Sequence, residues 1–321
     1  MAGIGTMVLE KFMLKMIAID MDGTLLGADG RVSDRNAAAL RMAERAGVEV
    51  VVATGRRHCY AMRVLRGLEL GAGNALVSSN GAVIRAVGNA KLVDRTLLGK
   101  STAEWLCAHL NEFRNALVMT FDLVGEDGED AMGALVVEEL EELHGSIGKW
   151  MEANKPYISH VVPMEKALAG EAPIQMMLCG TMERMRRAEA RLREHPRVMG
   201  VGVDADEKAE VTLHRTEYPE RDLSIVDILP AGCSKGAALR LLSDKRGHLV
   251  LNAQLPDCMA IGDNWNDVSM LEVAGHGVLM ANAPDDLKAL AAERGWVIGG
   301  RHDEDGVALA IEAALGLAAG G

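Results

Sequence analysis

The sequence of 321 residues has few aromatic residues and few cysteines. Its three Phe, three Tyr and four Trp are outnumbered by 19 Met. We therefore expect a hydrophobic core built mainly from flexible aliphatic side chains, and we assign the methionines no cofactor role. The five cysteines are odd in number and widely scattered, and no pair has CxxC or metal-ligand spacing. This pattern argues against a disulfide framework and favours buried, reduced thiols in a cytoplasmic protein.

Long apolar runs and an excess of positive charge are also missing. No apolar stretch reaches the length of a membrane-spanning helix, and residues 1–15 lack the basic start and apolar segment of a signal peptide. The formal net charge is −12, which argues against nucleic acid or an anionic membrane as a partner. Met7, Met13 and Met16 are alternative starts, so residues 1–13 are a candidate disordered extension.

Short apolar segments alternate with longer helical ones at the beginning of the chain. Strands are expected at residues 16–19, 48–53 and 75–78, and helices at 33–46 and 58–68. Each expected strand ends in small polar residues. This βαβ pattern is typical of a doubly wound parallel sheet.

The alternation is interrupted and then resumes. Between residues 95 and 224 the pattern is mixed: it predicts helices at 102–113, 135–143 and 182–195, strands at 116–124 and 173–179, and a hairpin of 198–203 with 209–214. The parallel pattern returns near Ile225. We therefore predict an α/β fold with a doubly wound parallel, Rossmann-like core of residues 1–94 and 225–321. An α+β domain of residues 95–224 is inserted in it.

Two aspartates, Asp20 and Asp22, follow the first apolar strand. The carboxyl ends of parallel strands are where open α/β sheets bind ligands, and Gly23 allows a turn that brings the second carboxylate in front of the first. Such a pair suits a hard cation, or a nucleophile beside an acid/base. The alternative is a solvated turn, because Asp-Gly is a common turn dipeptide.

Other polar residues stand at the ends of further expected elements. Three acids from two distant segments can hold Mg²⁺, while a threonine hydroxyl, neighbouring backbone N–H groups and a lysine can hold phosphate oxygens. A carboxylate beside the phosphorus would then be a nucleophile. The residues that the pattern brings together are Asp20, Asp22, Thr54, Gly55, Lys235, Asp263 and Asp267.

This combination resembles the haloacid dehalogenase (HAD) superfamily of phosphohydrolases, and within it the Cof-type branch. The DxDGT motif is Asp20-Met-Asp-Gly-Thr24, the Ser/Thr-Gly-Arg motif is Thr54-Gly-Arg56, the lysine is Lys235, and GDxxND spans residues 262–267. Asn80-Gly-Ala matches the NGA that precedes the inserted cap in this branch. The resemblance implies a HAD core, and it covers the cap only in position and coarse topology.

The resemblance also implies roles. Asp20 would attack phosphorus and form an aspartyl-phosphate, and Asp22 would be the acid/base. Mg²⁺ would bind Asp20, the backbone carbonyl of Asp22 and Asp263, with Asp267 as a further ligand or as a residue that orients the ligands. The groups expected to hold the phosphoryl oxygens or to contact substrate are Thr54, Gly55, Arg56, Asn80, Lys235 and Asn266.

The resulting hypothesis is a Mg²⁺-dependent hydrolase of a small phosphorylated metabolite, for instance a sugar phosphate. A phosphotransferase or phosphomutase with the same aspartyl-phosphate chemistry, and a non-catalytic phospholigand-binding protein, are the alternatives. Carbon–halogen hydrolysis is disfavoured, because a halide leaving group does not need the acid/base Asp22. The sequence leaves open the physiological substrate and the choice between monomer and homodimer.

Several polar residues near or beyond these motifs have structural interpretations. Arg57 is either a substrate contact or a solvated helix start, and His58 is expected at the surface or as a helix cap. Trp265 is expected to pack. Residues 138–142 are interpreted as a solvated helix face, and the acids of residues 204–207 as a hairpin turn rather than a metal site.

Overall fold

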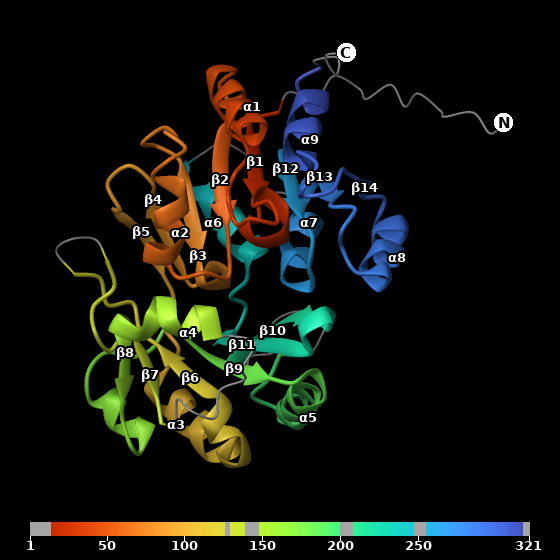
Figure 1. Ribbon diagram of the computed structural model, residues 1–321. Coiled ribbons are helices and arrows are strands. Elements are labelled where there is room, and N and C mark those ends of the chain that lie inside the picture. The colour runs from red at the N-terminus through yellow and green to blue at the C-terminus, as the bar shows by residue number, and fades with distance from the viewer. Residues whose placement is uncertain (1–13, 126–128, 139–147, 200–207, 247–254, 317–321) are drawn as a thin grey trace.

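The computed structural model describes residues 14–125, 129–138, 148–199, 208–246 and 255–316. They form two sheets, one above the other in Figure 1. None of the helices in this part of the chain has the length and apolar character needed to cross a membrane. All five cysteines lie in described segments and are buried as free thiols.

The first sheet, the core sheet, has eight strands within the described residues, in the order β14-β13-β12-β1-β2-β3-β4-β5. The six strands from β14 to β3 run parallel, and β4 and β5 are antiparallel. Their bounds are Met16–Ile19 (β1), Glu49–Ala53 (β2), Ala75–Ser78 (β3), Val83–Ala86 (β4), Leu92–Arg95 (β5), Leu255–Gly262 (β12), Ala274–Leu279 (β13) and Val297–Ile298 (β14). The predicted doubly wound parallel core is therefore confirmed.

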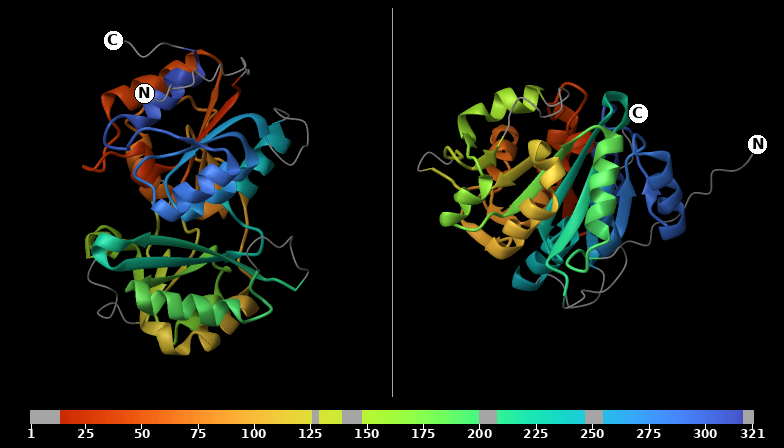
Figure 2. Two further views of the ribbon diagram at one scale, coloured as in Figure 1. Left: turned by 90° about the vertical axis from the view of Figure 1, so that its right-hand side faces the viewer. Right: turned by 90° about the horizontal axis from the view of Figure 1, so that it is seen from below.

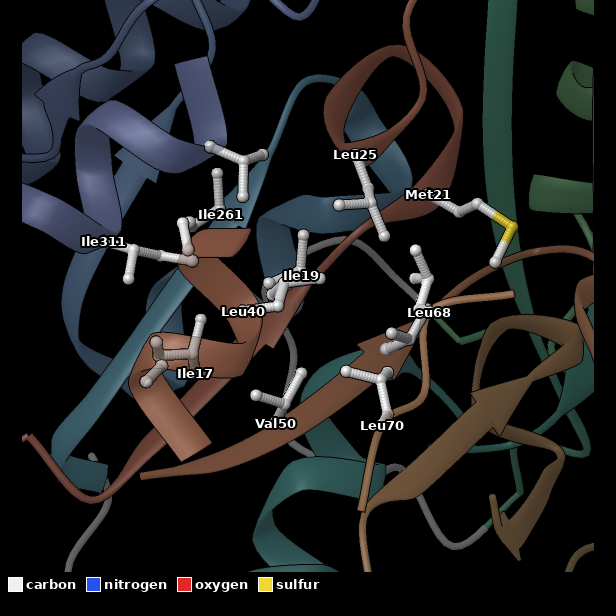
Figure 3. Packing of buried hydrophobic residues seen from close by; sticks show 14 of the residues in the cluster. Ile17, Ile19, Met21, Leu25, Leu40, Val50, Leu68, Leu70, Ile261 and Ile311 are labelled. Atoms are coloured by element: carbon white, nitrogen blue, oxygen red, sulfur yellow. The ribbon is translucent and has the colours of Figure 1, made fainter. Parts of the chain in front are cut away.

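Helices cover both faces of the core sheet. Successive side chains of its strands point to opposite sides, so each strand contributes to the packing on both faces. Ile17 and Ile19 pack with Leu40 and Ile311 on one face (Figure 3), while Met16 and Ala18 belong to the cluster on the other. The helices of this half of the chain are Asp34–Arg45 (α1), His58–Leu65 (α2), Lys235–Arg246 (α6), Val268–Val273 (α7), Asp285–Arg294 (α8) and Gly306–Ala314 (α9).

The second sheet, the cap sheet, has six strands among the described residues, in the order β10-β11-β9-β6-β7-β8. Their bounds are Leu117–Thr120 (β6), Leu135–Val137 (β7), Ile158–His160 (β8), Gln175–Gly180 (β9), Val211–Tyr218 (β10) and Leu223–Pro230 (β11). The helices of this part are Lys100–His109 (α3), Gly148–Asn154 (α4) and Met182–Arg193 (α5). Figure 2, left, shows the cap sheet lying between the core and helices α3 and α5.

Two secondary-structure predictions for the inserted region are wrong. The helix expected at 135–143 begins instead as strand β7, whose three buried residues pair with β6 and β8. Glu138 follows this strand and accepts hydrogen bonds from Arg114, so it does not lie on a solvated helix face; residues 139–147 lie outside the described residues. Val198 forms an isolated parallel bridge with Val211 instead of the expected hairpin, and residues 200–207 are not described.

The parallel pattern does not return at Ile225. Strand β11 pairs antiparallel with β10 and β9 in the cap sheet, and the parallel strands resume with β12. Strand β11 therefore crosses the expected boundary at residues 224 and 225. We propose residues 96–230 as the inserted domain, because this range contains every strand of the cap sheet that the structure describes.

Candidate active site

Asp20 lies at the carboxyl end of β1, in the middle of the core sheet. Strands β12 and β2 flank β1 in parallel, and the backbone N–H of Asp20 donates to Ile261 O of β12 at 2.9 Å. The side chain is buried. Its Oδ1 accepts a hydrogen bond of 2.5 Å from Lys235 Nζ. The first strand thus ends at a carboxylate, as the sequence predicts, and the structure shows that this carboxylate is buried.

Lys235 is the first residue of α6 and is fully buried. Its ammonium lies between two carboxylates, donating to Asp20 Oδ1 at 2.5 Å and to Asp267 Oδ1 at 2.6 Å. Burial by itself lowers the pKa of a lysine, but the two carboxylates outweigh it and the pKa of Lys235 is raised. The lysine is therefore a permanent cation that offsets negative charge in a buried place.

Asp263 and Asp267 follow β12, the strand that pairs with β1, and lie close to Asp20. Asp267 Oδ2 accepts the backbone N–H groups of Asp263 and Asn264 at 2.9 and 3.0 Å. Asp263 Oδ1 accepts from the hydroxyl of Thr24 at 3.1 Å. Asp267 thus holds the backbone of the loop after β12, and Asp263 is turned toward the turn of the DxDGT motif.

Gly23 makes this approach sterically possible. Its φ is +79°, in the left-handed region, and a Cβ at this position would lie 2.3 Å from Asp263 Oδ2. Only a residue without a side chain can adopt this backbone conformation and admit the carboxylate of the facing loop.

The carboxylates of Asp20, Asp263 and Asp267 form a site that suits a divalent cation. One oxygen from each lies within 4.8 Å of the others, the only such group of three among the described residues. Burial and then Asp267 raise the pKa of Asp20 to about 7, and burial and then Asp20 raise that of Asp263. Three buried carboxylates face one ammonium, so negative charge is in excess. A hard cation with oxygen ligands, such as Mg²⁺, fits both the charge and the donor set.

Asp22 lies apart from this group. Its carboxylate is 44% exposed and forms a bidentate pair with Arg56, with Nε to Oδ2 at 2.7 Å and Nη2 to Oδ1 at 2.5 Å. Arg56 also lies over the ring of Tyr60. The second aspartate is therefore accessible to water, and an arginine holds its carboxylate.

Four further predicted residues line the turns after β2 and β3 and the loop after β12. Thr54 is buried, and its hydroxyl accepts the backbone N–H of Arg56 at 3.1 Å. A Cβ on Gly55 would lie 3.2 Å from Asn80 Nδ2. Asn80 accepts from Asn266 Nδ2 at 3.1 Å. The expected phosphate-binding tips thus meet one another in space.

Sequence reasoning missed one partner of these residues. Asp227 of β11 is buried and accepts a hydrogen bond of 2.8 Å from Asn80 Nδ2. Burial raises the pKa of Asp227 to about 7, against the hydrogen bond from Asn80 that lowers it. The available signal was an acid inside the apolar run of residues 223–230. Asn80 therefore connects the cap sheet to the loop that carries Asp263 and Asp267.

The structure contradicts a solvated position for Arg57 and a surface position for His58. Arg57 is buried and contacts Asp130 and Asn154 of the inserted domain, so it is not a solvated helix start. His58 is 4% exposed, and its Nδ1 has no hydrogen-bond partner among the described residues. Burial lowers the pKa of His58 to about 4. Trp265 packs against a hydrophobic cluster of the core, as expected. The acids of residues 204–207 lie outside the described residues.

Comparisons with known proteins identify the same family as the sequence motifs. Residues 17–311 match the family model of haloacid dehalogenase-like hydrolases. The chain is 31% identical over 319 residues to the Bacillus subtilis 5-amino-6-(5-phospho-D-ribitylamino)uracil phosphatase YwtE, covering 94% of this chain and 98% of the relative. It is 30% identical over 278 residues to the HMP-PP phosphatase of Serratia proteamaculans, covering 87% and 88% of the two chains.

Solved structures agree in fold. A haloacid dehalogenase-like hydrolase from B. subtilis is similar with a TM-score of 0.71 at 25% identity, covering 93% of this chain and 99% of its own. A subclass IIB sugar phosphatase, BT4131, has a TM-score of 0.65 at 19% identity, covering 93% and 98%; this likeness concerns the fold alone. The chain therefore belongs to the haloacid dehalogenase-like hydrolases and is a hydrolase of their Cof-type phosphatase branch.

Proposed function

We propose that this protein is a Mg²⁺-dependent phosphomonoester hydrolase that acts on a small phosphorylated metabolite through an aspartyl-phosphate on Asp20. The observation that carries the proposal is the buried Asp20 carboxylate, bound to Lys235 through one oxygen and grouped with Asp263 and Asp267. A carboxylate so placed is both shielded from water and next to the charges that a phosphoryl group needs.

In the proposed reaction, Asp20 is the nucleophile and Asp22 is the acid/base. Asp20 attacks phosphorus as the bond to the ester oxygen breaks, and Asp22 gives that oxygen a proton. Asp22 then takes a proton from water, whose oxygen attacks the phosphorus of the aspartyl-phosphate, releasing inorganic phosphate and the free Asp20 carboxylate. Because Asp22 is paired with Arg56, this pair has to open before Asp22 can carry the proton.

The charges around Asp20 prepare the site for an anionic substrate. Lys235 cancels part of the negative charge of Asp20 and Asp267. When bound by Asp20, Asp263 and Asp267, Mg²⁺ would supply the remaining positive charge and polarise the phosphoryl group. We infer that the backbone carbonyl of Asp22 adds a further oxygen ligand.

Strand register supports a phosphate-binding role for the turn after β2. Ile19 of β1 lies opposite Val52 of β2, so Asp20 and Thr54 end neighbouring strands at the same edge of the sheet. We propose that Thr54, Gly55 and Asn266, with Lys235, hold the phosphoryl oxygens. We further propose that Arg56 contacts substrate once it releases Asp22. Asn80 is bonded to Asn266 and Asp227, and we propose that it acts by orienting Asn266.

The relatives support a small metabolite as substrate. Two of them are named as phosphatases of 5-amino-6-(5-phospho-D-ribitylamino)uracil and of HMP-PP. The deciding experiment incubates purified protein with Mg²⁺ and a panel of phosphorylated metabolites, together with p-nitrophenyl phosphate. Stoichiometric inorganic phosphate is the expected product. Phosphate that appears instead on an added alcohol or on a second hydroxyl would identify a phosphotransferase or mutase, and binding without turnover would identify a phospholigand-binding protein.

A further inference from the structure

The turn after β3 has an unusual backbone. We call residues 79–81 the β3 turn. The φ angles of Ser79, Asn80 and Gly81 are +48°, +51° and +106°, so three consecutive residues lie in the left-handed region. Glycine adopts this region readily, but a serine and an asparagine do so at a cost and persist there only where the surrounding structure holds them. Ser79 and Asn80 are fully buried, so the groups that hold the β3 turn belong to the protein.

The backbone of the β3 turn is bonded to the loop after β2. The N–H of Ser79 donates to Arg56 O at 2.9 Å, and the N–H of Asn80 donates to Thr54 O at 3.0 Å. Thr54 and Arg56 belong to the proposed substrate-binding group. The position of the β3 turn therefore bears directly on that group.

The β3 turn also touches the segment that leads into α6. A Cβ on Gly81 would lie 2.4 Å from Ser234 O. No side chain fits between the turn and the residue that precedes Lys235. The β3 turn thus lies against two of the segments that carry the proposed phosphate-binding residues.

The side chain of Asn80 connects two further residues. Its Nδ2 donates to Asp227 Oδ2 at 2.8 Å, and its Oδ1 accepts from Asn266 Nδ2 at 3.1 Å. Because the Asp227 oxygen accepts, the NH₂ end of the Asn80 amide faces Asp227 and the carbonyl end faces Asn266. Asn266 must then present its own NH₂ end to Asn80. Asp227 thereby determines the amide orientation of both asparagines.

Asn266 keeps hydrogen-bonding capacity for a ligand. Its side-chain nitrogen carries two hydrogens, and the bond to Asn80 needs only one of them. Its Oδ1 is buried and has no hydrogen-bond partner among the described residues. A buried amide with unused groups is costly unless a ligand completes its hydrogen bonds. This supports the proposed contact between Asn266 and the phosphoryl group.

Asp227 belongs to the inserted domain and has a well-fixed backbone there. It lies on β11, which has β10 on one side and β9 on the other, opposite His214 and Met177. Strand β11 ends at Pro230 and α6 begins at Lys235, and Figure 1 shows the chain passing there from the cap sheet to the core. The carboxylate that orients Asn80 is therefore anchored in the cap sheet, beside one of the two chain crossings.

We propose that Asp227 is a positioning residue for phosphoryl transfer: through Asn80 it fixes the amide of Asn266 that contacts the phosphoryl group. The inserted domain thus supplies a part of the phosphate site of the core. This inference rests on the proposed function, in which Asn266 holds a phosphoryl oxygen, and it adds a residue of the cap sheet to that site. Asp227 does not contact the substrate itself, so it acts on the rate only through Asn266.

The test is a double-mutant cycle between Asp227 and Asn266, measured as kcat/KM for p-nitrophenyl phosphate with Mg²⁺. Asp227→Leu removes the acceptor and should lower kcat/KM by about tenfold or more. Asp227→Asn can still accept from Asn80 through its amide oxygen and should stay within about threefold of the wild type. In an Asn266→Ala background, Asp227→Leu should lower kcat/KM by less than about threefold, because the residue through which it acts is gone. Loss caused only by damage to the fold would recur in both backgrounds.

Ser224→Ala is the matched control. Ser224 is buried on the same strand, and its hydroxyl has no hydrogen-bond partner among the described residues, so this change should leave kcat/KM unaltered. Should Asp227→Leu fail to fold, Asn80→Gly removes the same link from its other end, and glycine adopts the left-handed backbone at this position without strain. Asn80→Gly should lower kcat/KM by about tenfold or more alone, and by less than about threefold in the Asn266→Ala background.

Three outcomes overturn the inference. They are a kcat/KM of Asp227→Leu or Asn80→Gly within about threefold of the wild type, an Asp227→Asn protein as slow as Asp227→Leu, and an undiminished loss in the Asn266→Ala background. Failure of the proposed function has a different signature, which is no phosphate release by the wild type from p-nitrophenyl phosphate or the metabolite panel with Mg²⁺ present. That result would remove the proposed function and this inference together.

Discussion

Lys235 Nζ lies 2.5 Å from Asp20 Oδ1, although the two residues are 215 positions apart in the sequence. This ion pair joins the start of α6 to the carboxyl end of β1. Both side chains are buried, so neither charge can be satisfied by water if the other is removed. The contact therefore bears on the stability of the protein as well as on its chemistry.

Replacing this lysine should destabilise the fold. Lys235→Met leaves Asp20 and Asp267 buried without their cation, and we expect a loss of about 3–5 kcal/mol in the free energy of unfolding. Urea unfolding in EDTA measures it. Lys288→Met is the control, because Lys288 pairs with a fully exposed Asp285 side chain, and it should cost well under about 1 kcal/mol. Equal effects of the two substitutions would contradict the structural role of Lys235.

The nucleophile is tested by an isosteric change. Asp20→Asn should keep the fold, since the side chains have nearly the same shape, and should lower kcat by several orders of magnitude, since no aspartyl-phosphate can form. Phosphate release and thermal unfolding are measured together. Asp285→Asn, a change at the exposed side chain, should be silent. A folded Asp20→Asn protein with more than about a tenth of the wild-type turnover would show that another group attacks phosphorus.

Metal removal should abolish phosphate release, and Mg²⁺ should restore it. Ca²⁺ should inhibit, because its larger and looser coordination shell can take both oxygens of Asp20 and so occupy the attacking one. Mg²⁺ should also raise the melting temperature of the wild type, and by less in Asp263→Asn. Full turnover in EDTA or in Ca²⁺, or a Mg²⁺-dependent melting temperature unaffected by Asp263→Asn, would argue against the proposed metal site.

The buried His58 should make stability depend on pH. Its pKa falls from 6.5 in the unfolded chain to about 4 in the folded protein, so the unfolded state binds the extra proton between these values. The contribution of His58 is therefore present above pH 6.5 and is lost as the pH falls toward 4. We expect the wild type to lose about 2 kcal/mol more than His58→Leu between pH 7 and pH 5. Urea unfolding of both proteins at the two pH values measures the difference, and equal losses would refute the assignment.

The core and its motifs are predictable from the sequence because each strand and the motif that follows it are visible in one short stretch of residues. Strand β1 is one apolar run that ends directly before Asp20, and the prediction of β3 as residues 75–78 matches its bounds. Residues at the carboxyl ends of parallel strands must meet at one edge of the sheet, so Asp20, Thr54 and Asp263 could be grouped without knowing the structure.

The inserted domain is harder to predict because pairing, not local pattern, decides its structure. Strand β7 has only three residues, too few to distinguish a strand from part of a helix. The position of β11 in the cap sheet depends on its register with β9 and β10. The contact between Asp227 and Asn80 spans 147 positions, and no spacing in the sequence indicates it. His58 and Arg57 are buried by segments that are distant in the sequence, which helical periodicity alone does not reveal.

Strand β11 has a practical consequence for exchanging caps between members of this family. A junction between residues 224 and 225 would divide strand β11, so that its first two residues and the rest of the strand would come from different parents. A junction after Pro230 keeps β11 whole, but it then imports a foreign residue at position 227, opposite Asn80. Functional chimeras should therefore inherit the residues at 80 and 227 as a pair, whichever parent supplies the rest.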